Sequence, residues 1–280
     1  MRFIVVPALR ALAVAAAASG ALGLAPQTGA SRFALAEVFD PRGNTLVDVG
    51  ADDFVIQESG TAREVLSVRV ADYPVVVVID NGIAAQGDFP HIQRAAARFI
   101  DRLGPRPVAI VTAGGPPKVV ATFEDDRSVV GERLRALTTT VSNGQPLQAV
   151  ALAAATVRDS GALFSTIVLV TASQIEVGGT SAEGAVGPII DSHAVLHVIA
   201  RGLRPSSADP LRGLVAESRG EFNAIYSTAS YQPALDRLTD RMNTELLIEY
   251  IVPVNSQPVD VRIGVRVPGA RVRGLGVAPR

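Results

Sequence analysis

The chain has 280 residues, of which 48% are hydrophobic and 19% charged, and its formal net charge at pH 7 is −1. This composition is typical of a folded globular protein with a substantial core, and it argues against intrinsic disorder. The near-neutral charge gives no general attraction to nucleic acid or to an anionic membrane surface, so we expect neither as a partner. The chain contains no cysteine, which excludes disulfides, thiolate metal sites and cysteine nucleophiles.

Residues 1–30 have the features of a secretory signal peptide. Arg2 and Arg10 flank a short apolar start, and residues 11–25 form a run rich in alanine and leucine that small residues interrupt. Such a run is too short to span a membrane comfortably. We expect cleavage after 28–30 (Thr-Gly-Ala), with 19–21 (Ser-Gly-Ala) as second choice, and an uncleaved N-terminal anchor is the alternative. The protein is therefore expected to be periplasmic or secreted, without membrane insertion once the signal is removed.

Residues 31–72 are expected to form an N-terminal β segment. Short runs at 33–39, 53–58 and 64–70 have strand character, and turn-forming residues separate them. No helical periodicity appears in this part of the chain.

The pattern changes at Tyr73 to alternating strands and helices, which continue to residue 243. Five consecutive β-branched residues at 75–79 indicate a strand that is buried on both faces. Further buried strands are expected at 108–112, 166–171 and 194–200, and an edge strand at 118–123. Helices are expected to begin after residue 88, after residue 125 or 126, and after residue 145, and to cover 211–218 and 233–243. This alternation predicts an α/β domain, Rossmann-like and three-layered, with a mostly parallel central sheet.

Residues 244–280 return to strand patterns. Apolar and polar residues alternate strictly over 259–267, and 246–252 is expected to be the partner of that strand across a turn at 253–258. Each β-rich end of the chain is too small to form a core alone. We therefore expect residues 31–72 and 244–280 to pack together as one β-rich appendage.

Asp80, Asn81 and Gly82 directly follow the strand at 75–79. In open α/β sheets, ligands bind beyond the carboxyl ends of the strands, so a site is expected there. Asp80 could be a remnant metal ligand, or its carboxylate could cap the following loop or helix by accepting backbone N–H bonds. We favour the capping role.

Several motifs, taken in order, resemble those of bacterial von Willebrand factor A (VWFA)-related proteins. Residues 42–60 resemble the family's β segment D-G-x-x-V-x-x-L-x-x-x-D-F-x-V-x-E-D-G, and 214–222 (LVAESRGEF) resembles its L-A-x-x-T-G-G-x-x-F pattern, which Glu249-Tyr250 and a closing strand follow. The resemblance implies a VWFA domain at 73–243. In typical members it also implies a metal-ion-dependent adhesion site, built from D-x-S-x-S, a later threonine and an aspartate after the fourth strand.

Transferred to this sequence, the adhesion site is degenerate. The first aspartate is Asp80, but Gly82 and Ala84 replace the two serines, Gln145 replaces the threonine and Ala172 replaces the second aspartate. Magnesium prefers an octahedral set of oxygens, so we expect no cofactor and no metal, although a weak Mg²⁺ contact at Asp80 stays open. The expected binding rim is formed by Asp80, Asn81, Gly82, Ala84, Gln145, Ala172 and Ser173, next to the 177–180 loop.

The sequence contains no credible catalytic constellation. His193 and His197 are four residues apart, but the surrounding residues from 194 on are predicted to form a strand, where that spacing is about 13 Å. We therefore expect an exported, non-enzymatic binding module of VWFA type, independent of metal, with a protein partner. The alternatives are a metal-dependent adhesion protein that uses a residual site at Asp80 and an exported α/β hydrolase with a site at Asp80, Gln145 and Ser173.

Overall fold

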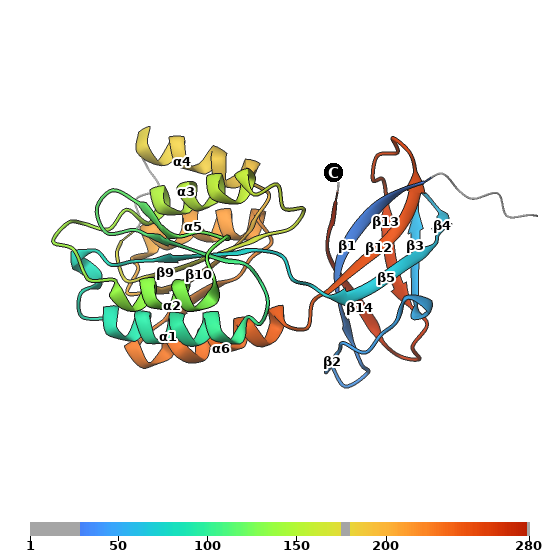
Figure 1. Cartoon of the computed structure of the whole chain (residues 1–280), viewed down its shortest axis with the longest axis horizontal. Helices are drawn as coiled ribbons and strands as arrows, with labels where there is room; N and C mark the ends of the chain where they lie inside the picture. The colour runs from blue at the N-terminus through green and yellow to red at the C-terminus, as the bar shows by residue number, and fades with distance from the viewer. Residues whose placement is uncertain (1–28, 175–179, 279–280) are drawn as a thin grey trace, which may run out of the picture.

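The computed structural model describes residues 29–174 and 180–278, which form two units side by side (Figure 1). One is a three-layer α/β unit, and the other is a β-rich unit built from both ends of the chain. The predicted fold class is thereby confirmed. Residues 1–28 of the predicted signal peptide, and residues 177–179 of the loop expected beside the rim, lie outside the described residues.

The α/β unit is built on a six-stranded sheet with the order β11-β10-β9-β6-β7-β8. Its strands are β6 (Val75–Ile79), β7 (Val108–Thr112), β8 (Lys118–Ala121), β9 (Thr166–Thr171), β10 (Val195–Arg201) and β11 (Phe222–Ile225). Neighbouring strands are parallel except β8, which runs antiparallel to β7 at the edge. All five residues of β6 are buried, as expected for a strand that is covered on both faces.

Helices cover both faces of this sheet (Figure 1). On one face lie α1 (Phe89–Arg102), α2 (Arg127–Ala136) and α6 (Tyr231–Met242), and on the other lie α3 (Pro146–Asp159), α4 (Thr180–Asp191) and α5 (Pro205–Glu217). Successive residues of β6 point to opposite faces, so that Val75 and Val77 join the first core and Val76 and Val78 join the second. Helix α4 was not predicted, because its sequence contains glycines and an internal proline.

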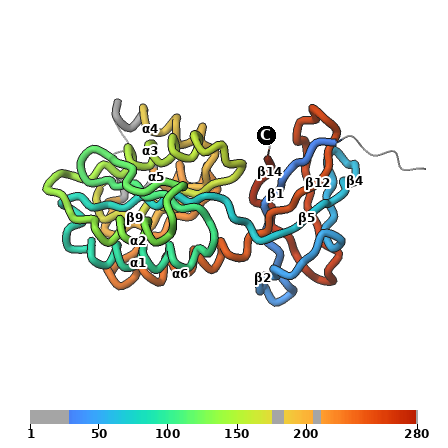
Figure 2. Tube along the Cα trace, in the orientation of Figure 1, coloured from blue at the N-terminus to red at the C-terminus, as the bar shows by residue number. Residues whose placement is uncertain are grey.

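The β-rich unit consists of two antiparallel sheets. The larger has the order β14-β1-β12-β5, with β2 on β1, and the smaller has the order β13-β3-β4. The strands are β1 (Gly29–Phe39), β2 (Thr45–Leu46), β3 (Phe54–Glu58), β4 (Thr61–Arg63), β5 (Val65–Val70), β12 (Leu246–Pro253), β13 (Val261–Val265) and β14 (Arg271–Ala278). Strands β1 and β14, the first and last of the described chain, lie side by side here (Figure 2), and Ala34, Ile56 and Ile248 share the core of this unit.

One predicted strand pairing is wrong. Strand β12 does not pair with the strand after it, because β1 and β5 occupy its two edges. Strand β13 pairs with β3 instead, in the smaller sheet. A period of two predicts that a strand exists and which of its faces is buried, but it does not identify the partner. Strand β14 was not predicted, because Gly274 and Gly276 interrupt its pattern.

Two connections, at residues 71–74 and 243–245, join the two units. Both lie at the end of the α/β unit where its parallel strands begin, because β6 starts at Val75 directly after the first connection. The carboxyl ends of the same strands, including Asp80, therefore lie at the opposite end of the unit (Figure 1).

Candidate functional site

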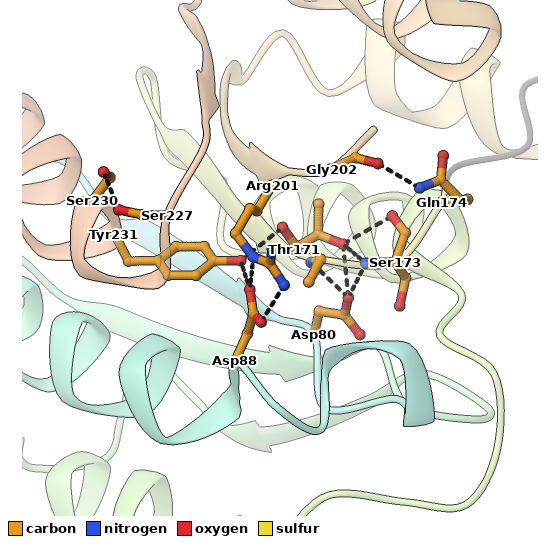
Figure 3. A network of polar contacts seen from close by, with 11 residues as sticks. Asp80, Asp88, Thr171, Ser173, Gln174, Arg201, Gly202, Ser227, Ser230 and Tyr231 are labelled. Atoms are coloured by element: carbon orange, nitrogen blue, oxygen red, sulfur yellow. Dashed lines mark hydrogen bonds and ion pairs between the residues drawn. The ribbon is translucent and has the colours of Figure 1, made fainter. Parts of the chain in front are cut away.

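Asp80 lies at the carboxyl end of β6, and its side chain is fully buried (Figure 3). One carboxylate oxygen, Oδ2, accepts hydrogen bonds from Thr171 Oγ1 at 2.7 Å, Ala172 N at 3.1 Å and Ser173 N at 2.8 Å. The other oxygen accepts one from Gly82 N at 3.1 Å. The carboxylate thus ties its own loop to the end of β9, which is the backbone-binding role that the sequence favoured.

The side chain of Asn81 is also used within the protein. Its Nδ2 donates to Thr138 O at 2.9 Å, and its Oδ1 accepts a hydrogen bond from Gly114 N at 2.7 Å. Its backbone oxygen accepts from Thr140 N at 2.8 Å. Asn81 therefore connects two neighbouring loops, and its amide oxygen already has a donor.

Two glycines let the backbone close over Asp80. A Cβ placed on Gly82 would lie 2.5 Å from Gly144 N, and one placed on Gly144 would lie 2.6 Å from Ser173 Oγ and 2.9 Å from Asp80 Oδ1. All three distances are too short for a real Cβ atom. The backbone of residue 144 therefore lies directly against the Asp80 carboxylate, and only glycine fits at 82 and 144.

Backbone hydrogen bonds hold the loop of residues 142–145 in place over Asp80. Gln145 N donates to Ala113 O at 2.6 Å, and Ile83 N donates to Ser142 O at 2.9 Å. The loop is thus anchored to the segments that follow both β6 and β7. We call residues 142–145 the covering loop.

A pocket of about 370 Å³ opens beside the covering loop. None of the described residues that line it is ionisable, and they include Ala84, Asn143, Gln145, Gln148, Ser173 and Gln174. Gln174 is engaged at both ends, since its Nε2 donates to Gly202 O and its Oε1 accepts from Arg204 N. The Ser173 hydroxyl is buried and makes no hydrogen bond within the described part of the chain.

The residues predicted for the rim therefore separate into two groups. Asp80, Asn81 and Gly82 form a covered centre, whereas Ala84 and Gln145 line the open pocket beside it. Ser173 belongs to both, because its N–H binds Asp80 and its side chain lines the pocket. Ala172 contributes its backbone N–H, and its side chain packs against the core under α1 and α6. Among the residues that the structure describes, no three His, Asp or Glu side chains are grouped as a metal site.

A second polar network, at the carboxyl ends of the parallel strands, was not predicted from the sequence. Arg201, at the end of β10, binds both carboxylate oxygens of buried Asp88, with Nη2 2.5 Å from Oδ1 (Figure 3). Tyr231 Oη donates to Asp88 Oδ2 at 2.8 Å and lies 3.3 Å from Thr171 O. Burial alone would raise the pKa of Asp88, but the bonds from Arg201 and Tyr231 outweigh it and lower that pKa. One sequence feature could have indicated this network: a charged residue, Arg201, ends a buried strand.

His197 has a structural environment, in the first half of β10 and apart from the site at Asp80. It is buried on β10, and its Nδ1 accepts a hydrogen bond from Glu221 N at 3.1 Å. Burial, with a smaller effect from Arg241, lowers its pKa to about 3. His197 is therefore neutral at physiological pH, and His193 lies in the turn before the strand with a left-handed φ of 55°.

The arrangement of strands and helices is that of von Willebrand factor type A domains. A structure described as von Willebrand factor type A from Catenulispora acidiphila is 13% identical, with a TM-score of 0.54, over 90% of this chain and 74% of that one. The SpRpn10 VWA domain is also 13% identical, with a TM-score of 0.50, over 60% of this chain and 95% of that one. No family model matches the sequence. No curated protein sequence matches it either. At these identities the similarity establishes the fold, and it confirms the fold that the motifs implied.

Proposed function

We propose that the protein is an exported, non-enzymatic module of VWFA type that binds a protein partner without a metal ion. The proposal rests chiefly on the contact of Gly144 with Asp80. In the VWFA resemblance, Asp80 is the position of the first metal ligand, and here a backbone segment lies against its carboxylate.

The oxygens around Asp80 do not fit a magnesium site. Three donors already bind Oδ2 and a fourth binds Oδ1. Gly82, Ala84 and Ala172 have no side-chain oxygen, and magnesium requires near-octahedral coordination at about 2.1 Å. Four internal hydrogen bonds satisfy the buried charge of Asp80, so the site needs no cation for stability.

The surface next to the covering loop has the mixture of amide and apolar groups that suits a protein partner. Asn143, Gln145 and Gln148 line the open pocket. Two large apolar side chains flank them, Ile83 with 46% of its surface exposed and Val141 with 92%. Exposed apolar side chains beside hydrogen-bonding groups are typical of interaction surfaces.

Export is proposed from the sequence of residues 1–30, whose basic start, short apolar run and small residues are typical of a cleaved signal. This makes the periplasm or the exterior the proposed location. None of the helices in the described part of the chain is long and apolar enough to cross a membrane.

The test is a pull-down from the cell envelope with the full chain and with two variants. In Ile83→Asp/Val141→Asp, two charges are placed beside the pocket, and Val254→Asp places one on the β-rich unit as the control. We expect the same partner to be enriched with the unmodified chain and the control, in EDTA as in magnesium, and to be lost with the double variant. Enrichment that requires magnesium would favour the metal-dependent alternative, and equal enrichment by all three chains would refute the proposed surface.

A further inference from the structure

A second cavity lies at the opposite end of the parallel sheet, between the two units. Its volume is about 200 Å³, and both units contribute to its lining. The α/β unit contributes Val195 and His197, the β-rich unit contributes Leu35 and Arg273, and Glu245 comes from a connection between the units. We call this cavity the junction pocket.

The junction pocket contains an unused hydrogen-bond donor. His197 is only 3% exposed, and its Nδ1 accepts the Glu221 N–H, so the proton of the neutral ring is on Nε2. In the described part of the chain, no acceptor is bound to Nε2. Because His197 lines the cavity, a ligand there could accept this hydrogen bond.

Cationic groups slightly outnumber anionic groups around the junction pocket. Four guanidinium groups surround three carboxylates, and these residues are Arg106, Arg219, Arg241, Arg273, Glu37, Glu221 and Glu245. Buried Glu37 binds Arg273 and lies 3.5 Å from Arg241. Buried Glu245 accepts a hydrogen bond from the Tyr73 hydroxyl. The most exposed of the lining cations, Arg219 and Arg273, retain N–H groups beyond those that these contacts use.

Arg219 has an unusual backbone conformation for its side chain. It occupies the position of a glycine in the family pattern, and its φ is 62°, in the left-handed region. Such a conformation is unfavourable for a non-glycine residue, because its Cβ crowds the following carbonyl oxygen. Its guanidinium Nη1 donates to Leu275 O at 2.7 Å across the junction. The side chain is therefore placed at the mouth of the pocket in spite of an unfavourable backbone.

We propose that the junction pocket binds a small monocarboxylate with a compact apolar body. His197 Nε2 and the guanidinium of Arg219 would donate hydrogen bonds to its carboxylate, and Leu35, Val195 and Leu275 would contact its apolar part. A cavity of about 150 Å³ holds benzene, so a branched short-chain or single-ring carboxylate matches the available space. This site is independent of the rim at Asp80, because it lies at the other end of the sheet.

Binding in this pocket should weaken as the pH rises. Burial raises the pKa of Glu245 to about 7, against smaller lowering effects from Tyr73 and Arg106. A bound carboxylate disfavours a second negative charge beside it. His197 stays neutral and the arginines stay charged over the same range. Glu245 is therefore the group whose ionisation would oppose the ligand.

The test is calorimetric titration of the full chain with sodium benzoate and sodium isovalerate, and with the matched uncharged amides benzamide and isovaleramide, at pH 6 and pH 8. Two variants alter the pocket in different ways. Arg219→Gly removes the guanidinium and also relieves the left-handed strain, so it should fold, and Leu275→Trp fills the cavity while keeping every charge. Arg42→Gly, in an exposed turn outside the pocket, is the control.

At least one carboxylate should bind saturably, about tenfold more tightly than its amide, with affinity that falls from pH 6 to pH 8. Loss of a charge-assisted hydrogen bond should weaken binding about tenfold or more in Arg219→Gly, and Leu275→Trp should abolish it, whereas Arg42→Gly should bind normally. No saturable binding of either carboxylate, equal binding of acid and amide, or unchanged affinity in Arg219→Gly would each overturn the proposal.

Discussion

The two ends of the parallel sheet accommodate buried carboxylates in different ways. At the carboxyl end, the buried charge of Asp80 is satisfied by backbone N–H groups and one hydroxyl, and glycines let the loops approach it closely. At the amino end, Glu37 and Glu245 are satisfied by long side chains from both units. Backbone donors leave no space around a carboxylate, whereas arginine and tyrosine side chains enclose a cavity.

This difference has a consequence for what each end can do. The VWFA resemblance places the chemistry at the carboxyl end, but there the central carboxylate is covered, and the described residues that line the open pocket beside it carry no charge. The charged and titratable groups with room for a ligand lie at the amino end, where the appendage packs. Substitutions at the two ends should therefore have different effects on stability.

Asp80→Ala should have the largest effect on stability. It removes the acceptor of Thr171 Oγ1, Ala172 N and Ser173 N. Thr171 Oγ1 and Ser173 N keep only their contacts with each other's residue, at 3.4 Å and 3.1 Å. Hydrogen bonds to a charged group contribute about 1.5–3 kcal/mol each, so we expect a loss of about 4 kcal/mol in the free energy of unfolding. Urea denaturation measures it, with the exposed Asp48→Ala as the control. A loss below about 1 kcal/mol would show that the network contributes little.

Gly82→Ser should destabilise the protein rather than restore a metal ligand. A Cβ at this position would lie 2.5 Å from Gly144 N and 2.8 Å from its Cα, so the covering loop would have to move. Overpacking of this kind costs about 3 kcal/mol. Gly131→Ala is the matched control, since nothing lies within 4 Å of its Cβ position in α2, and alanine should stabilise that helix slightly. Equal stability of the two variants would contradict the close contact.

The pH dependence of stability should separate the two ends, because Glu245 has a pKa near 7 and Asp88, at the carboxyl end, has a lowered one. A carboxyl whose pKa is raised on folding binds more protons in the folded state, so its contribution falls as pH rises from its unfolded pKa to its folded one. For Glu245 the fall between pH 5 and pH 8 is on the order of 2 kcal/mol.

Glu245→Gln isolates this effect, because the amide oxygen can still accept the Tyr73 hydrogen bond. His197 acts in the opposite direction, since its lowered pKa makes stability fall as pH drops below 6.5. The unmodified protein alone would therefore show a nearly flat profile. We expect the stability of the unmodified protein relative to Glu245→Gln to decrease from pH 5 to pH 8 in urea denaturation. Parallel profiles would exclude Glu245 as the titrating group.

The sequence was informative where local pattern decides the structure. Five β-branched residues predicted β6, and the end of that strand placed Asp80 at the sheet edge beside Ser173. The sequence was uninformative where the pairing partner of a strand comes from a distant segment of the chain. Alternation could not choose between β12 and β3 as the partner of β13.

Side-chain networks were the other limit of the sequence. The residues Asp88, Arg201 and Tyr231 come from three separate elements, and none of them belongs to a motif. The junction pocket depends on how the appendage packs on the α/β unit, which no periodicity encodes. The covering role of Gly144 could not be foreseen either, because the sequence indicates that a glycine is present but not which atoms it approaches.

Magnesium should have the smallest effect of all. A ligand stabilises the native state only to the extent that it binds there, and the Asp80 carboxylate already accepts four internal hydrogen bonds and lies against Gly144. We therefore expect 1 mM MgCl₂ or MnCl₂ to change the melting temperature by less than about 1 °C, since a site with a Kd well above the metal concentration contributes only a few tenths of a kcal/mol. Differential scanning calorimetry with and without EDTA measures this, and Asp80→Asn is the matched variant because it removes the charge but retains the shape. A metal-dependent rise in the melting temperature of the unmodified protein that disappears in Asp80→Asn would mean that the covering loop opens to admit a cation. The carboxyl end would then have the metal-dependent role that its backbone contacts oppose.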